Sequence, residues 1–152
     1  MLLSKARAGG YGVCMAWDHF TSAKGTQVFF RVDGASLENV IYGHMDISVA
    51  VRLQAEFDVV ERAHGRFVGF HYWLHAPSYD SDYRALWIKW LGEKKGTLEE
   101  THFLTRSRMV RMGLAVANIA YSRIEFVTHT DEATYLAARE RHMSFAAIPP
   151  RP

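Results

Sequence analysis

The chain has 152 residues, of which 49% are hydrophobic and 22% are charged. This length and composition fit one folded domain and exclude an intrinsically disordered chain. The net charge of +2 comes from scattered basic residues, so no nucleic-acid partner is expected, because nucleic-acid binders gather their basic residues on one surface.

The two ends of the chain differ in composition from the part between them. Residues 1–25 contain the glycine-bearing breaks "GGYG" and "SAKG", and we interpret them as an N-terminal extension that drapes over the domain. Residues 146–152, "AAIPPRP", are expected to form a C-terminal tail, since consecutive prolines lack amide donors and fix φ. We therefore expect a single domain over residues 26–145.

The first half of this domain predicts two strands and a helix. Residues 26–34 and 39–45 are rich in β-branched and aromatic residues and are separated by an Asp-Gly turn signal, so we expect an antiparallel hairpin. A helix is expected over residues 46–65, capped by Asp46 or Ser48. Its apolar stripe repeats every three or four residues, at Val49, Leu53, Phe57 and Val60.

The second half alternates strands and helices. Residues 66–74, "RFVGFHYWL", form a near-continuous apolar run, as expected for a central strand covered on both faces. A helix begins near residue 81, where apolar residues recur at helical spacing: Tyr83, Leu86, Trp87, Trp90 and Leu91. The remaining elements are a strand over 99–107, a helix over 108–122, a strand over 123–130 and a helix over 131–143.

The order of the elements, β-β-α-β-α-β-α-β-α, predicts the fold class. A hairpin followed by β-α units indicates a single α/β domain, with a mixed, mostly parallel sheet of about five strands and about four helices packed on it. With "DSD" at residues 80–82, this order resembles the STAS family, which includes bacterial anti-sigma-factor antagonists and is related to Sec14-like proteins. The resemblance covers residues 26–143 and implies a STAS-like, non-catalytic protein-interaction domain in a bacterial regulatory or scaffolding complex.

The "DSD" loop carries the functional part of the resemblance. In the antagonists this loop reads approximately Asp-Ser-Ser-Gly, and a partner kinase phosphorylates one of its serines. Asp80 and Ser81 match the first two positions, whereas Asp82 stands at the usual phosphoserine position and Tyr83 at the glycine. The resemblance thus implies a fixed carboxylate in place of the switch, with Ser81 as the remaining candidate for phosphorylation.

Helix capping explains the same loop without a signalling role, because Asp and Ser are preferred at helix N-termini, and the two interpretations are compatible. The partner is expected to be another protein, with a second copy of the chain as an alternative. Arginines at the start of the helix over residues 108–122 oppose its dipole, and solvation, neighbouring acids or an anionic partner would each explain them. The candidate partner-binding residues are Ser78, Asp80, Ser81, Asp82, Tyr83, Arg108 and Arg111.

The alternative function is a small carrier of an apolar or lipid-like ligand, as the relation to Sec14-like proteins implies. Core packing accounts for most of the aromatic residues, but their number also suits an apolar pocket. The set consists of Phe70, Tyr72, Trp73, Trp87 and Trp90. Alternation along residues 66–74 places Phe70 and Tyr72 on one face of the strand and His71 and Trp73 on the other.

No metal or cofactor is expected, although the chain has eight histidines. His71 and His75 are four residues apart, which in a strand is about 13 Å, too far for one metal ion. The neighbours Glu99 and Glu100 face opposite ways in a strand and cannot flank one substrate atom. Common catalytic and nucleotide-binding motifs are missing from the sequence, so an enzyme with an unrecognised site is the weakest of the three hypotheses.

The cellular location is expected to be the cytoplasm. The single cysteine, Cys14, cannot form a disulfide within the chain. No stretch approaches the roughly 18 apolar residues of a membrane span.

Overall fold

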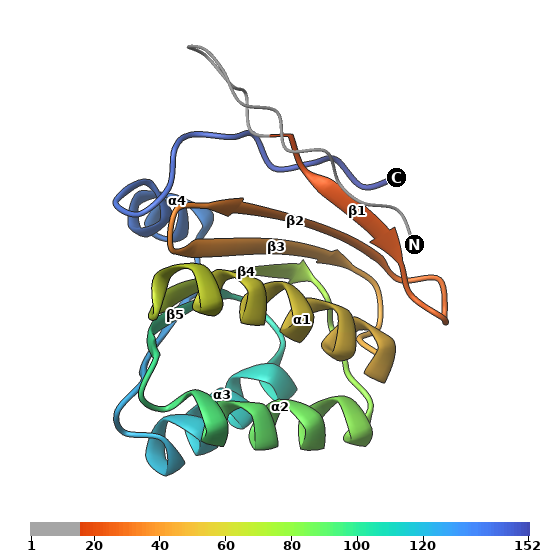
Figure 1. Cartoon of the computed structure of the whole chain (residues 1–152). Helices are drawn as coiled ribbons and strands as arrows, with labels where there is room; N and C mark the ends of the chain where they lie inside the picture. Colours follow the sequence, from red (N-terminus) through yellow and green to blue (C-terminus); the bar gives the residue numbers. More distant parts are fainter. Residues whose placement is uncertain (1–15) are drawn as a thin grey trace.

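The computed structural model describes residues 16–152, which form a six-stranded sheet with helices packed on it (Figure 1). The strands are β1 (Asp18–Thr21), β2 (Gln27–Asp33), β3 (Ser36–Tyr42), β4 (Phe67–His75), β5 (Leu98–Leu104) and β6 (Glu125–His129). The helices are α1 (Ile47–His64), α2 (Ser81–Lys94), α3 (Arg108–Ala120) and α4 (Glu132–Glu140). The strands lie side by side in chain order.

The sheet is mixed, with β1, β2 and β3 antiparallel and β3, β4, β5 and β6 parallel. The predicted α/β fold with a mostly parallel sheet and four helices is confirmed. The sheet has six strands where about five were expected, because β1 adds a strand within residues 1–25. Its sequence, DHFT, has one apolar residue and no alternation, but the edge of β2 pairs with it, with Asp18 opposite Phe30.

The two faces of the sheet carry different helices. α1, α2 and α3 lie on one face, where Trp90 of α2 belongs to the same core as Trp73 of β4. α4 lies on the other face, where Tyr135 packs with Phe70 and Tyr72. The alternation predicted along β4 is therefore confirmed, and the sheet separates two cores.

The start of α1 agrees with the sequence, since Asp46 is its N-cap. The Asp46 carboxylate accepts hydrogen bonds from the Ser48 amide at 2.9 Å and from the Ser22 hydroxyl at 2.5 Å. This cap therefore also holds the turn between β1 and β2 against the helix. None of the helices found between residues 16 and 152 combines the length and apolar composition needed to cross a membrane.

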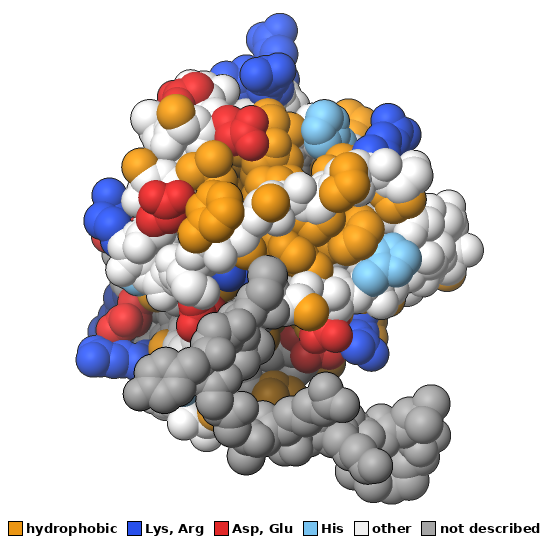
Figure 2. All heavy atoms as spheres, turned by 90° about the horizontal axis from the view of Figure 1, so that it is seen from above, with side chains coloured by type: hydrophobic (Ala, Val, Ile, Leu, Met, Phe, Trp, Pro, Cys, Tyr) orange, Lys and Arg blue, Asp and Glu red, His pale blue; other side chains and the backbone are white. Residues whose placement is uncertain are grey.

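Residues 146–152 have no regular secondary structure but are bonded to the rest of the domain. The Tyr42 hydroxyl donates to the Pro149 carbonyl oxygen at 2.5 Å, and the Trp17 indole N–H donates to the Ala147 carbonyl oxygen at 3.0 Å. This segment lies on the β1 side of the molecule (Figure 1). Figure 2, viewed toward that side, shows hydrophobic side chains in a continuous area bordered by charged ones.

A buried charge network fixes α4 on the sheet. Glu38 of β3 is fully buried, and its carboxylate accepts hydrogen bonds from the Arg31 Nε at 3.0 Å, an Arg139 terminal nitrogen at 3.3 Å and the Tyr135 hydroxyl at 3.1 Å. Arg31 also donates to the Ser144 carbonyl oxygen at 3.0 Å. The network therefore joins the β2–β3 hairpin, α4 and the segment that follows α4.

We expect Glu38→Gln to lower the free energy of unfolding by about 3–5 kcal/mol, because it leaves two buried guanidinium groups without a counter-charge. Urea unfolding followed by circular dichroism measures this loss. The matched control is Glu99→Gln, which removes an exposed ion pair with Arg66 and should cost less than about 1 kcal/mol. Equal losses in the two variants would contradict the structural role of Glu38.

Candidate functional site

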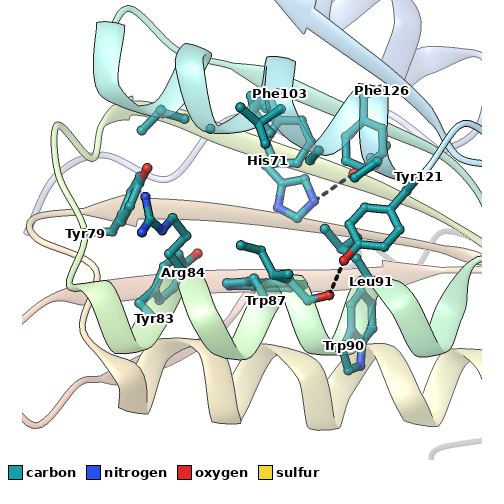
Figure 3. A pocket seen from close by; sticks show the side chains of 18 of the residues that line it. His71, Tyr79, Tyr83, Arg84, Trp87, Trp90, Leu91, Phe103, Tyr121 and Phe126 are labelled. Atoms are coloured by element: carbon teal, nitrogen blue, oxygen red, sulfur yellow. Dashed lines mark hydrogen bonds between the residues drawn. The ribbon is translucent and has the colours of Figure 1, made fainter.

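An apolar cavity lies between the sheet and the helices α2 and α3 (Figure 3). Its volume is about 430 Å³. α2 contributes Trp87 and Leu91 to its wall, α3 contributes Leu114, and the strands β5 and β6 contribute Phe103 and Phe126. A space of this size and lining is typical of sites for small apolar ligands.

The cavity exists because α3 is attached to the domain mainly at its two ends. At its start, the Ser107 hydroxyl donates to the Pro77 carbonyl oxygen at 2.8 Å. At its end, the Tyr121 hydroxyl donates to the Ile88 carbonyl oxygen of α2 at 2.9 Å. Between these points only Val110 and Ala117 of α3 are buried, and these small side chains leave space above the sheet.

A hydrogen-bonded network of buried side chains supports the floor of the cavity. His71 of β4 lies with its Nδ1 2.9 Å from the Asn39 Nδ2 and its Nε2 3.0 Å from the Thr101 Oγ1. The Trp73 indole N–H donates to the Asn39 Oδ1 at 2.8 Å. Burial lowers the pKa of His71 to about 3, so the imidazole is neutral near pH 7. The floor is thus uncharged, and its polar atoms already have partners.

Two polar atoms on the α2 wall differ from the floor. Among the described residues, neither the Tyr83 hydroxyl oxygen nor the Trp87 indole nitrogen has a hydrogen bond of good geometry, although both are buried and the indole N–H lies close enough to the Tyr83 oxygen to oppose the rise of its pKa. Burial raises the pKa of Tyr83, so its hydroxyl keeps its proton and is a donor. A buried donor without a partner costs free energy, which an acceptor on a bound molecule would recover.

The mouth of the cavity is lined by exposed apolar side chains. Met112 and Val116 of α3 expose 70% and 65% of their surface and still belong to the cavity lining. Ile88 of α2, which faces the same cavity, is exposed as well. Arg84, also exposed, is the cationic side chain among the lining residues. An apolar molecule can therefore enter without crossing a polar rim on the α3 side.

The "DSD" loop is built differently from the predicted cap. Asp80 is the N-cap residue of α2, but its carboxylate makes no capping hydrogen bond. One of its oxygens lies 2.7 Å from the His44 Nε2 and the other 2.9 Å from the Lys24 Nζ. The Ser78 hydroxyl lies 2.7 Å from the His44 Nδ1. The hydrogen bonds to Lys24 and His44 lower the pKa of Asp80, so the carboxylate holds two loops together instead of capping the helix.

The predicted partner-binding residues divide into exposed and buried ones. Ser81, Asp82, Arg108 and Arg111 are exposed. Tyr83 is only 3% exposed and lines the cavity, so its expected place on a partner-facing surface is corrected. Its helical spacing with Trp87 and Trp90 already carried this signal.

The structure does bring the two predicted segments together. The hydrogen bond between Ser107 and Pro77 places the start of α3 beside the loop that precedes α2. Of the aromatic residues considered for a pocket, Trp73, Trp87 and Trp90 line the cavity. Phe70 and Tyr72 do not, because strand alternation turns them toward α4. The contacts of Asp80 with His44 and Lys24 carried no local sequence signal, since these residues meet only in the folded chain.

The fold has a counterpart among solved structures. No family model and no curated protein sequence matches the chain. The crystal structure of an uncharacterized protein of the DUF3478 family from Shewanella loihica PV-4, described as having a SpoIIAA-like fold, is similar, with a TM-score of 0.56 and 11% identity. The match covers 88% of this chain and 98% of that one. The chain therefore has the SpoIIAA-like fold that the resemblance to STAS domains predicted.

We expect His71 to destabilise the fold as the pH falls. Unfolded histidine takes up a proton below about pH 6.5, whereas folded His71 stays neutral down to about pH 3. The unfolded state gains a proton across this window, so His71 lowers the free energy of unfolding by about 1.4 kcal/mol per pH unit. The variant His71→Gln lacks this contribution. The difference in the free energy of unfolding between the unmodified protein and this variant should therefore shrink between about pH 7 and about pH 4.

Urea unfolding of both proteins across this pH range measures the change. His64→Gln, at an exposed position, is the matched control for the loss of a histidine. A difference for His71→Gln that does not change with pH would contradict a buried, neutral His71.

Proposed function

We propose that the protein binds a small apolar molecule bearing one hydrogen-bond acceptor in the cavity between the sheet, α2 and α3. The observation that carries this proposal is the pair of buried donors on the wall of an apolar cavity, the Tyr83 hydroxyl and the Trp87 indole N–H, which lie near each other but make no hydrogen bond of good geometry within residues 16–152. This is the carrier function that the relation of STAS domains to Sec14-like proteins implies.

The cavity limits the size of the ligand. Ligand-binding pockets measure about 300–1,000 Å³, and the cavity of about 430 Å³ lies near the lower end of this range. A medium-length alkyl chain or a ring system of two or three rings fits such a space, and a complete phospholipid does not.

The charges around the cavity limit the chemistry of the ligand. The floor is neutral because His71 is neutral, so a buried charged group on the ligand would have no counter-ion there. Arg84 lines the cavity but is exposed to solvent. A neutral acceptor, such as a hydroxyl, carbonyl or ether oxygen, therefore suits the α2 wall, and a negative charge is accommodated only at the mouth.

A second candidate function is the binding of a regulatory protein at the surface formed by the loop before α2 and the start of α3. It is favoured by the exposed side chains of Ser81, Asp82, Arg108 and Arg111 and by the hydrogen bond between Ser107 and Pro77 that joins the two segments. Ser78 and Asp80 support this surface through their contacts with His44. A cytoplasmic, bacterial regulatory or scaffolding complex, with Ser81 as a phosphorylation site, belongs to this second candidate.

Filling the cavity is expected to weaken ligand binding. Ala117→Phe places a ring in the cavity from α3, and we expect it to weaken binding of the apolar fluorophore N-phenyl-1-naphthylamine at least about tenfold. The matched control is Ala115→Phe, which adds the same ring to the exposed side of the same helix and should leave affinity within about twofold. Fluorescence titration measures both values. Equal affinities for the two variants would contradict the proposed site.

The same titration tests the acceptor on the ligand. 1-Decanol carries one hydroxyl oxygen and should displace the fluorophore. Trp87→Phe removes one donor and should lower the affinity for 1-decanol about two- to tenfold, which is the contribution of one hydrogen bond. The affinity for the fluorophore should fall less.

The protein-binding candidate predicts a different result. Asp82→Lys reverses an exposed charge and should abolish capture of the partner by the tagged chain in its native host, without lowering the melting temperature by more than a few degrees. Glu93→Lys, an exposed charge reversal near the other end of α2, is the matched control and should retain the partner. Mass spectrometry identifies the captured protein and any phosphate on Ser81. Unchanged capture by Asp82→Lys would exclude this surface.

A further inference from the structure

A cluster of metal-binding side chains lies on the α4 side of the sheet, away from the cavity. It consists of Glu100 and His102 on β5 and His142, which follows α4. One ligand atom from each residue lies within 4.8 Å of the others. The cavity and its proposed ligand play no part in this cluster.

Strand alternation and the end of α4 bring the three residues together. Glu100 and His102 are two residues apart in β5, so their side chains leave the same face of the sheet. The His142 amide donates to the Arg139 carbonyl oxygen at 2.9 Å, which holds the turn after α4. Arg139 is itself bound to the buried Glu38, so the position of His142 is fixed through the core.

Of the distances within the cluster, the one between Glu100 and His142 already matches a zinc site, whereas the one between Glu100 and His102 is that of a hydrogen bond. The Glu100 Oε1 lies 2.5 Å from the His102 Nε2, and the Glu100 Oε2 lies 3.5 Å from the His142 Nε2. A tetrahedral zinc ion with bonds of about 2.0–2.2 Å holds its ligand atoms about 3.3–3.5 Å apart. To admit the ion, the Glu100 carboxylate would turn away from the His102 Nε2 and give up this hydrogen bond.

The second nitrogen of His102 also has a partner, the ring of another histidine. The His102 Nδ1 lies 2.9 Å from the His129 Nε2, and the His129 Nδ1 lies 3.2 Å from the Thr134 Oγ1. Thr134 in turn donates to the Asp131 carboxylate at 3.1 Å. When His102 and His129 both carry their proton on Nδ1, every donor in this chain has an acceptor, and the His102 Nε2 lone pair is free for a metal ion.

The cluster is also open to solvent on one side. The His102 side chain is only 1% exposed and stacks on Phe70 with a centroid distance of 4.7 Å. The side chains of Glu100 and His142 are 22% and 29% exposed. An ion can therefore reach the site from solvent, and the buried imidazole holds it against the sheet.

We propose that Glu100, His102 and His142 bind a zinc ion, with a water molecule as the fourth ligand. Two histidines and one carboxylate are a known zinc ligand set that leaves one position open. An ion pair between Glu100 and His102 alone explains their short contact, but it does not explain a second histidine on the same carboxylate or the ordered chain behind His102. The sequence argument against a metal considered His71 and His75, which do not belong to this cluster.

Cobalt binding to the full chain tests the proposal, because four-coordinate Co²⁺ in a site with nitrogen ligands absorbs visible light and Zn²⁺ displaces it. We expect one Co²⁺ per chain with visible absorption bands. His142→Gln should weaken Zn²⁺ binding, measured by calorimetry, by more than about a hundredfold, since the loss of a ligand exceeds the ten- to hundredfold typical of outer partners. His129→Gln, which removes a positioning residue, should weaken it about ten- to hundredfold.

The matched control is His64→Gln, at an exposed position on the other face of the sheet, and it should bind Zn²⁺ like the unmodified protein. His142 is exposed, so its variant is expected to fold even where a change at the buried His102 does not. Binding of N-phenyl-1-naphthylamine should be unchanged in His142→Gln, which separates this site from the cavity. Equal Zn²⁺ affinity of His142→Gln and His64→Gln, or no visible bands with Co²⁺, would overturn the proposal.

Discussion

The arrangement on the α4 side of the sheet depends on the compensation of one fully buried carboxylate, that of Glu38. A carboxylate without solvent contact requires nearby cations and hydrogen-bond donors, and Arg31, Arg139 and Tyr135 supply them from two other elements. Such a network adds little net stability compared with an apolar core, but it is directional. α4 can satisfy it in one position only, and that position also fixes His142, three residues beyond Arg139.

The face of the sheet that borders the cavity differs, because its helices pack on it mainly through apolar side chains. Within residues 16–152, the buried polar side chains at the floor form the network of His71, Asn39, Trp73 and Thr101, whose hydrogen bonds all lie within the sheet and do not involve the helices. α3 is therefore held by hydrogen bonds at its ends and by two small buried side chains. Apolar packing is not directional, so a helix attached in this way does not have to close onto the sheet. The face without directional bonds is the one with space for a ligand.

The sequence predicted what depends on local periodicity. The α1 stripe, the Asp46 cap, the alternation along β4 and the order of strands and helices all follow from spacing within one element. Features that depend on distant partners were not predictable. β1 exists because the edge of β2 is available, and the Asp80 carboxylate leaves its helix because His44 and Lys24 lie beside it in the folded chain. Tyr83 was expected on the partner-binding surface and is buried. Its helical spacing predicted the core, whereas its place in the "DSD" comparison predicted the surface.

The two proposed sites are connected by one strand. Thr101 of β5 bonds to His71 under the cavity, and its neighbour His102 belongs to the zinc cluster on the opposite face. A signal from one site to the other would have to shift β5 along its length. β5 is paired on both edges, with β4 and β6, so such a shift breaks hydrogen bonds on both sides at once. The sheet therefore opposes a sliding motion between the sites, and the coupling that remains is the electrostatic effect of His102 on His71, which lowers the pKa of His71 further.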